Sequence, residues 1–323
     1  MGITLNSFAF IAAALCVGLM GFAIQRGATC TVAAVDEILT RRTCRRLVSL
    51  LEAALWVAGG LLIAQHLHLL GKMPAGYAIS LWTVLGGALL GLGAFINGAC
   101  VFGAIARFGS GQWSYVLMPV GFYVGCVTVG QVFGLPAPHK LDVGSPVLQA
   151  AWLMPLFVAF VVWRIARPFV AGRPSGFALR VWEPHAATIV IGITFLFTLL
   201  LAGAWAYTDV LAELSRGMAG SLVARSLLLL GLLLGATLGG WTAGRLRSTR
   251  ISVAQLSKCF AGGVLMGWGS LLIPGGNDGL ILVGMPLLWP YAWLAFATMC
   301  VTIAVGQALR NGLNAPMAET TAS

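Results

Sequence analysis

Two cysteines follow glycine-containing interruptions of apolar segments, and they are the residues of this chain best suited to chemistry. Cys30 ends the run Gly27-Ala28-Thr29-Cys30, and Cys100 ends the run Asn97-Gly98-Ala99-Cys100. Small residues let a ligand approach the backbone closely, and the first N–H groups of a helix have no partner within that helix. A thiol placed there is a weak S–H donor that suits a polarisable sulfur or selenium atom. Tight packing without a ligand is the alternative that the sequence leaves open.

A third interruption, Gly275-Gly276-Asn277-Asp278, carries a carboxylate instead of a thiol. Asp278 stands alone between the charge-free stretches 259–277 and 279–309. A carboxylate at membrane depth costs at least about 2.5–3.5 kcal/mol on insertion scales. We therefore expect Asp278 to be protonated, paired with an arginine or exposed to a water-filled vestibule. Arg26, the first charge of the chain, either reaches the membrane interface or faces an anion in a pathway.

Two of these interruptions belong to an internal repeat. Residues 86–103 read GGALLGLGAFINGACVFG, and residues 262–279 read GGVLMGWGSLLIPGGNDG, 176 positions later. Each copy is a helix rich in small residues that runs into a glycine-rich break. Paired broken helices in the two halves of a membrane chain indicate a transport site.

The composition places these elements in a lipid bilayer. Of 323 residues, 59% are hydrophobic and 9% are charged, against roughly 25% charged in soluble domains. The sequence predicts an all-α polytopic membrane protein with about nine transmembrane helices plus short re-entrant half-helices. The expected spans are 5–24, 47–67, 79–97, 114–134, 147–165, 185–206, 222–243, 258–273 and 288–308.

The net charge of +10 indicates topology rather than nucleic-acid binding. The basic residues cluster in three short loops, around 41–46, 164–180 and 245–258, as is typical of cytoplasmic loops. The loops 68–78, 136–146 and 207–217 then lie outside. The two repeat copies cross the membrane in opposite directions, which predicts an inverted repeat. We divide the chain into a first membrane repeat (1–165), a basic cytoplasmic linker (166–184) and a second, inverted repeat (185–323) with a short disordered C-terminal tail.

No pattern for cofactor or metal chemistry is found. The seven cysteines form no CxxC pair, no His/Cys spacing resembles a zinc site, and no Ser/His/Asp set converges. The run GLGAFING lacks the βαβ unit that a dinucleotide site requires. We therefore expect no metal, no cofactor and no enzymatic activity.

Three motifs resemble the YeeE/YedE family, the sulfur-transport domain proteins that include bacterial thiosulfate importers. They are QRGATCTVAAVDE around Cys30, GxGAxxxGxCxxG around Cys100 and GGxLxGxGS at 262–270. The resemblance implies an hourglass-like inner-membrane fold, with thiosulfate passing a narrow midplane constriction aided by S–H contacts from Cys30 and Cys100. It also implies a cytoplasmic sulfurtransferase of the TusA type as a partner. Relatives carry a third cysteine in the second-half break, where this chain has Gly276.

The sequence thus predicts transport of a small sulfur-containing anion, thiosulfate or similar, across the bacterial inner (plasma) membrane by a multi-pass protein. The alternative is a membrane thiol protein that relays sulfane sulfur or electrons through Cys30 and Cys100. The expected partners are the anion, the lipid bilayer and the TusA-like protein, with no nucleic acid. The predicted substrate-pathway residues are Cys30, Cys100, Arg26, Gly98, Gly275, Gly276, Asn277 and Asp278.

Overall fold

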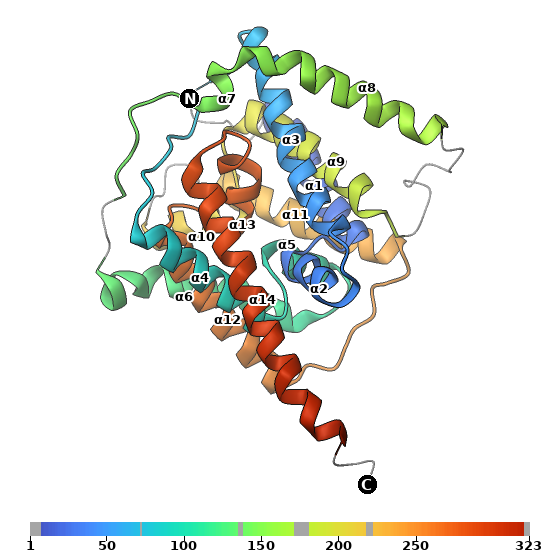
Figure 1. Cartoon of the computed structure of the whole chain (residues 1–323), viewed down its shortest axis with the longest axis vertical. Coiled ribbons are helices and arrows are strands. Elements are labelled where there is room, and N and C mark those ends of the chain that lie inside the picture. The colour runs from blue at the N-terminus through green and yellow to red at the C-terminus, as the bar shows by residue number, and fades with distance from the viewer. Residues whose placement is uncertain (1–7, 72, 135–137, 171–180, 218–221, 320–323) are drawn as a thin grey trace.

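The chain folds into helices packed around two sets of short, interrupted ones. The computed structural model describes residues 8–71, 73–134, 138–170, 181–217 and 222–319 (Figure 1). The long helices are α1 (Phe8–Gly27), α3 (Arg45–His66), α4 (Leu81–Asn97), α6 (Leu117–Phe133), α8 (Met154–Val170), α9 (Pro184–Ala202), α11 (Leu222–Thr242), α12 (Val253–Leu272) and α14 (Pro290–Glu319). The short ones are α2 (Thr31–Arg41), α5 (Val101–Gly109), η1 (Trp113–Val116), α7 (Pro146–Gln149), η2 (Ala151–Leu153), α10 (Tyr207–Ser215), α13 (Asn277–Gly279) and η5 (Leu280–Gly284). These ranges contain no strand, only one isolated bridge.

The helices confirm the predicted class of polytopic membrane protein. Within the described ranges, seven helical segments are long and apolar enough to cross a bilayer. An eighth is the broken pair 253–272 and 277–284, which bends by 50° at the interruption. A shorter apolar helix, Met154–Arg164, occupies the remaining predicted span.

The two repeat helices, α4 and α12, pack against each other backbone to backbone. A Cβ on Gly86 would lie 2.8 Å from the carbonyl oxygen of Gly269, and one on Gly93 would lie 2.6 Å from that of Gly262. Small residues allow this approach in membranes. Because the later residue of one helix meets the earlier residue of the other, α4 and α12 run antiparallel.

The neighbouring helices repeat one arrangement in each half. α6 runs parallel to α12, since Gly121 packs on Phe260 and Gly125 packs on Val264. α14 likewise runs parallel to α4 and packs against it. The pair α6 and α12 therefore becomes the pair α14 and α4 when the two halves are exchanged. The pair α1 and α11 becomes the pair α9 and α3 in the same exchange.

Contacts between loops agree with the predicted sidedness. Tyr77 and Lys140, from two loops predicted to lie outside, form an antiparallel bridge. The Arg247 N–H, in a loop predicted to lie inside, donates to the Ser110 carbonyl over 3.2 Å. We call the two ends of the molecule the predicted outer face and the predicted inner face.

A buried carboxylate fastens α3 to α8 and α9. Glu52 is 8% exposed and accepts a hydrogen bond from Arg164 Nε over 2.7 Å. Its other oxygen hydrogen-bonds with His185 Nδ1. The sequence did not predict this cluster of Glu52, Arg164 and His185.

Two boundaries differ from the sequence prediction. α8 extends to Val170, into the predicted linker 166–184, of which residues 171–180 lie outside the described residues. α14 continues to Glu319, through most of the tail predicted to be disordered. That tail contains alanine, leucine and methionine, which are good helix formers.

Candidate functional site

Four short helices begin at positions that correspond in the two halves. Cys30 and Cys100 are the N-caps of α2 and α5, while Ala206 and Gly276, each 176 positions later, are the N-caps of α10 and α13. Cys100 (φ −74°, ψ −177°) and Gly276 (φ −79°, ψ 177°) have nearly the same backbone conformation. The glycine before the break allows the chain to turn, since Gly98 has φ +72°.

The first pair of helix starts brings the two predicted thiols together. The side chains of Cys30 and Cys100 are in hydrogen-bonding contact with each other. The Thr31 N–H donates to Cys100 Sγ over 3.1 Å, and the Cys100 N–H donates to the Cys30 sulfur. Each short helix thus directs a backbone donor at the thiol of the other. Cys30 is 9% exposed and Cys100 is fully buried, so the pair is closed to solvent in this conformation.

Polar groups without partners surround this thiol pair. Thr31 Oγ1 and Asn97 Oδ1 are buried and have no hydrogen-bond partner among the described residues. Such atoms are rare in folded proteins and call for an explanation. Gly103 keeps the space tight, because a Cβ there would overlap Cys30 Sγ. The site is therefore compact, yet it retains unused hydrogen-bonding capacity.

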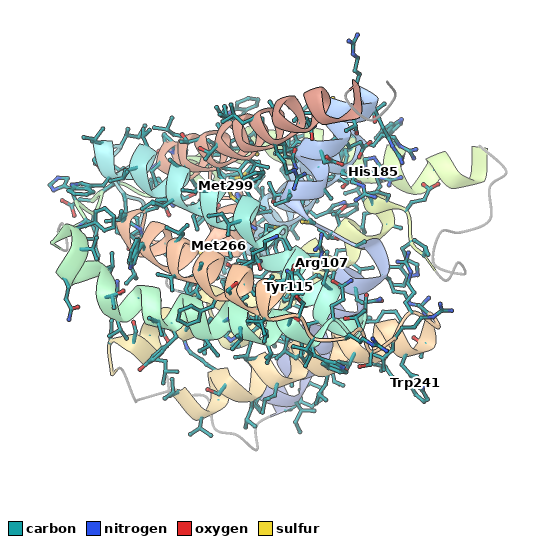
Figure 2. The ribbon with its side chains drawn as sticks, turned by 90° about the horizontal axis from the view of Figure 1, so that it is seen from below. Arg107, Tyr115, His185, Trp241, Met266 and Met299 are labelled. Atoms are coloured by element: carbon teal, nitrogen blue, oxygen red, sulfur yellow. The ribbon has the colours of Figure 1, made fainter. Side chains whose placement is uncertain are left out.

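Arg107, on α5, is a functional candidate that sequence reasoning missed. It donates to the Tyr115 hydroxyl, and its guanidinium lies 5.2 Å from the centre of that ring. Figure 2 shows both residues near the middle of the molecule. It acts electrostatically on Cys30, and Gly98 lies beside it. The available signal was its isolation between the charge-free stretches 73–106 and 108–139.

The second pair of helix starts forms a separate centre around Asp278. The Thr208 N–H donates to Asp278 Oδ2 over 3.1 Å, and the Thr208 hydroxyl donates to Oδ1. Asp278 is 2% exposed and Thr208 is fully buried. A Cβ on Gly276 would overlap the Thr208 side chain. None of the ion pairs in the described part of the chain involves Asp278, so of the three expected states the arginine pair is not found, and a threonine holds the carboxyl group instead.

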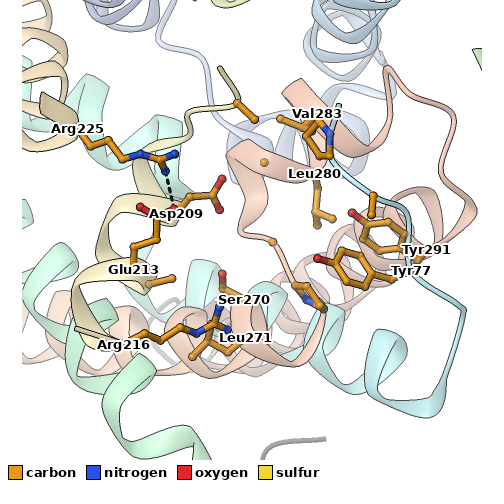
Figure 3. Close-up of a pocket in the computed structure, with 17 residues that line it drawn as sticks. Tyr77, Asp209, Glu213, Arg216, Arg225, Ser270, Leu271, Leu280, Val283 and Tyr291 are labelled. Atoms are coloured by element: carbon orange, nitrogen blue, oxygen red, sulfur yellow. Dashed lines mark hydrogen bonds and ion pairs between the residues drawn. The ribbon is translucent and has the colours of Figure 1, made fainter. Parts of the chain in front are cut away.

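An open cavity of about 280 Å³ lies above this centre on the predicted outer face (Figure 3). Gly275 is in its wall, together with Asp209 and Glu213 of α10. Glu213 forms an ion pair with Arg225 Nη1 of α11 over 2.5 Å. The remaining lining residues are Pro74, Ala75, Tyr77, Ala204, Ala212, Arg216, Ser270, Leu271, Pro274, Gly279, Leu280, Val283 and Tyr291.

A mostly apolar zone is found next to Asp278, on the side of α5. It contains a void of only about 10 Å³, lined by Phe102 and Ile105 of α5 together with Phe195, Leu282 and Asp278. This zone brings side chains of the first-half helix α5 against those of the second-half break. The contacts therefore group the predicted residues into two centres, instead of the single point expected from sequence.

The structure also places the two other predicted residues. Arg26 donates to Thr242 Oγ1 of α11 over 2.9 Å and stacks over Phe22, 5.0 Å from the ring centre. Asn277 is fully buried, and neither its Nδ2 nor its Oδ1 has a hydrogen-bond partner within the described ranges. Among the described residues, no group of three His, Cys, Asp or Glu side chains could hold a metal ion.

The chain matches a known protein family. A family model described as sulphur transport matches residues 26–305, a range that includes both centres. No curated protein matches the chain. Because the match covers most of the sequence, the chain belongs to the sulphur-transport family, the YeeE/YedE family.

Proposed function

We propose that this protein transports a small sulfur-containing anion, thiosulfate or a similar species, through a narrow passage between its interrupted helices. The observation that carries the proposal is the contact of Cys30 with Cys100 at the starts of α2 and α5. Helix N-termini bear partial positive charge and unpaired N–H groups. The N-termini of α2 and α5 meet at one point and therefore favour binding of an anion. The two thiols favour an anion that carries a polarisable sulfur atom.

The buried groups beside the thiols support a polar substrate. The Thr31 hydroxyl can donate to an anionic oxygen, and the Cys100 thiol can donate to a terminal sulfur. An anion at this point would replace the thiol–thiol contact with contacts to itself. The pair therefore acts as a constriction that opens when substrate occupies it.

The proposed route of the anion connects the outer cavity to the thiol pair. The anion enters the outer cavity at Gly275, passes Asp278 and Asn277 beside the apolar zone, and reaches Cys30 and Cys100. It leaves past Gly98 and Arg107, toward the predicted inner face. Gly276 keeps α13 close to α10, and Arg26 anchors α1 to α11 near the predicted inner face.

The basic loops orient the protein in the inner (plasma) membrane of a bacterium. A cytoplasmic sulfurtransferase of the TusA type would receive the anion and keep its internal concentration low. The protein itself makes and breaks no bond, so it is a transporter and not an enzyme.

Uptake of labelled thiosulfate into proteoliposomes tests this function. We expect Cys100→Ala to lower uptake by roughly tenfold or more, the equivalent of one hydrogen bond to a charged group. Cys300→Ala is the matched control, because Cys300 lies within the long helix α14 and is not at the start of a short helix. Unchanged uptake by the correctly inserted Cys100→Ala protein would remove the thiol pair from the mechanism.

The contact between the two thiols also favours a second candidate, a relay of sulfane sulfur or electrons. A relay requires a persulfide or a disulfide on Cys30 or Cys100 during turnover. Mass spectrometry of the protein after exposure to thiosulfate distinguishes the two functions. Free thiols throughout uptake indicate transport, and a trapped covalent adduct indicates a relay.

A further inference from the structure

The outer cavity contains an arrangement of charge that the thiol site does not explain. Among its lining residues are two arginines, Arg216 and Arg225, and two carboxylates, Asp209 and Glu213. Figure 3 shows them on one side of the cavity, facing the tyrosine rings on the other. With all four ionised, the cavity wall is neutral, and the buried Asp278 adds one negative charge behind it.

The two arginines differ in how they are used. Arg225 is committed to Glu213, at 2.5 Å. Arg216 is exposed at the cavity wall and has no ion-pair partner among the described residues. An arginine in this position can bind an anionic oxygen through two parallel N–H donors. Arg216 is therefore the group of the cavity that is best placed to hold an anion.

Asp209 opposes such binding while it is ionised. Its carboxylate faces the short helix α13, with Oδ1 3.8 Å from where a Cβ of Gly279 would lie. An anion held by Arg216 shares the cavity with this carboxylate. Like charges that share a partly enclosed cavity repel each other. A proton on Asp209 would remove this repulsion and give the cavity wall a net positive charge.

We propose that the cavity is the outer capture site for the anion, in which Arg216 holds the anion and Asp209 takes up a proton as it binds, so that anion and proton enter the pathway together. This inference rests on the proposed function and identifies a proton as the ion that is coupled to transport of the anion. The anion is one with separated oxygens that can accept from a guanidinium, as the oxygens of thiosulfate can. The proton moves from the outer solution to Asp209, and no covalent bond to the anion forms or breaks.

The charged and titratable groups around Asp209 support protonation there. Burial, followed by the charges of Asp278 and Glu213, raises the pKa of Asp209 to about 7, against the opposing effect of Arg225 and Arg216. The hydroxyls of Tyr77 and Tyr291 face the same cavity and are neutral at this pH. Asp209 therefore changes its charge in the range where a proton gradient across a membrane operates.

The test measures anion and proton movement together in proteoliposomes. Labelled thiosulfate uptake is recorded with the outer pH at about 6 and about 8, while a pH-sensitive dye inside reports protons. We expect wild-type uptake to fall by up to about tenfold at the higher pH, as the protonated fraction of Asp209 falls, and thiosulfate to acidify the interior. Asp209→Asn should make uptake insensitive to pH and abolish acidification. Asp142→Asn, an exposed carboxylate on the predicted outer face, is the control that should change neither.

Arg216→Gln tests the other half of the proposal. It should raise the half-saturating thiosulfate concentration by roughly tenfold, whereas Arg250→Gln, in a loop of the predicted inner face, should not. Equal uptake at both pH values, or unchanged pH dependence in Asp209→Asn, overturns the inference. The proposed function survives that result if Cys100→Ala still lowers uptake by roughly tenfold or more.

A second measurement stands independently of transport. Thiosulfate binding to the detergent-solubilised protein is followed by calorimetry in two buffers that differ in ionisation enthalpy. Proton uptake on binding by the wild type, and its loss in Asp209→Asn, supports the inference. Binding without proton uptake, or no binding, overturns it.

Discussion

Replacing Gly276 with alanine tests whether the second-half interruption depends on the contact between α13 and α10. The backbone at Gly276 (φ −79°, ψ 177°) is one that any residue adopts, so alanine adds no backbone strain. Its methyl group, however, would overlap the side chain of Thr208. That side chain is fully buried and donates to Asp278, so it cannot move aside without releasing the carboxylate.

The expected cost follows from these two effects. Overpacking of a closed site costs about 1–3 kcal/mol. Loss of a hydrogen bond to a charged group adds about 1.5–3 kcal/mol. We therefore expect Gly276→Ala to lower the free energy of unfolding by about 2.5–6 kcal/mol. The melting midpoint should fall by roughly 2 °C for each kcal/mol of that loss.

A thiol-reactive fluorophore can follow the unfolding in detergent, because Cys100, Cys126 and Cys259 are buried in the folded protein. The matched control is Gly203→Ala. Gly203 has φ +83° and ψ −179°, with no atom within 4 Å of a Cβ there, so its substitution costs only backbone strain, on the order of 1–3 kcal/mol. A Gly276→Ala protein that melts no lower than this control refutes the reasoning.

Three further predictions concern other contacts. Glu52→Ala leaves Arg164, whose side chain is 15% exposed, without its partner and should lower stability by about 3 kcal/mol, the lower end of the range for a buried pair; a melting midpoint equal to that of wild type would contradict this. Gly103→Ala, whose methyl overlaps Cys30 Sγ, should slow copper-catalysed disulfide formation between the thiols, and an unchanged rate would show that they tolerate displacement. Burial raises the pKa of Asp209 from 3.8 to about 7, so between these values the folded protein holds a proton that the unfolded chain has lost, and stability falls as pH rises. Asp209→Asn should therefore melt above wild type at about pH 8, with the difference gone near pH 4, and the idea fails if the two proteins melt alike throughout.

The sequence predicts the helices and their interruptions well, because both are local properties. A long apolar run must be a helix in a bilayer, and a glycine-rich break within it must end one. Cys30, Cys100 and Gly276 were found this way, and the structure makes each the N-cap of a short helix. The fourth break, at Ala206, contains nothing unusual in composition. Only the 176-residue offset applied to Cys30 would have indicated it.

The contacts between the short helices could not be predicted from the sequence, because they depend on how distant segments pack. Asp278 was predicted to be protonated, paired with an arginine or exposed to a vestibule, but nothing local identifies Thr208, 70 positions earlier, as its hydrogen-bond donor. Asp209 was predicted only as part of an outer loop, whereas it lines the outer cavity. Its chemistry arises from burial and from neighbours on other helices.

The glycine contacts between α4 and α12 have a consequence for how the molecule can move. Where Gly86 meets Gly269 and Gly93 meets Gly262, no side chain separates the two backbones. At these points the joint has no side-chain rotamers with which to absorb sliding or rotation, so we expect the two repeats to resist rocking against each other. We therefore expect substrate passage to come from displacements of the short helices α2, α5, α10 and α13 inside a fixed frame. The protein would then be gated locally at its short helices, without a rocker-switch movement of its two halves.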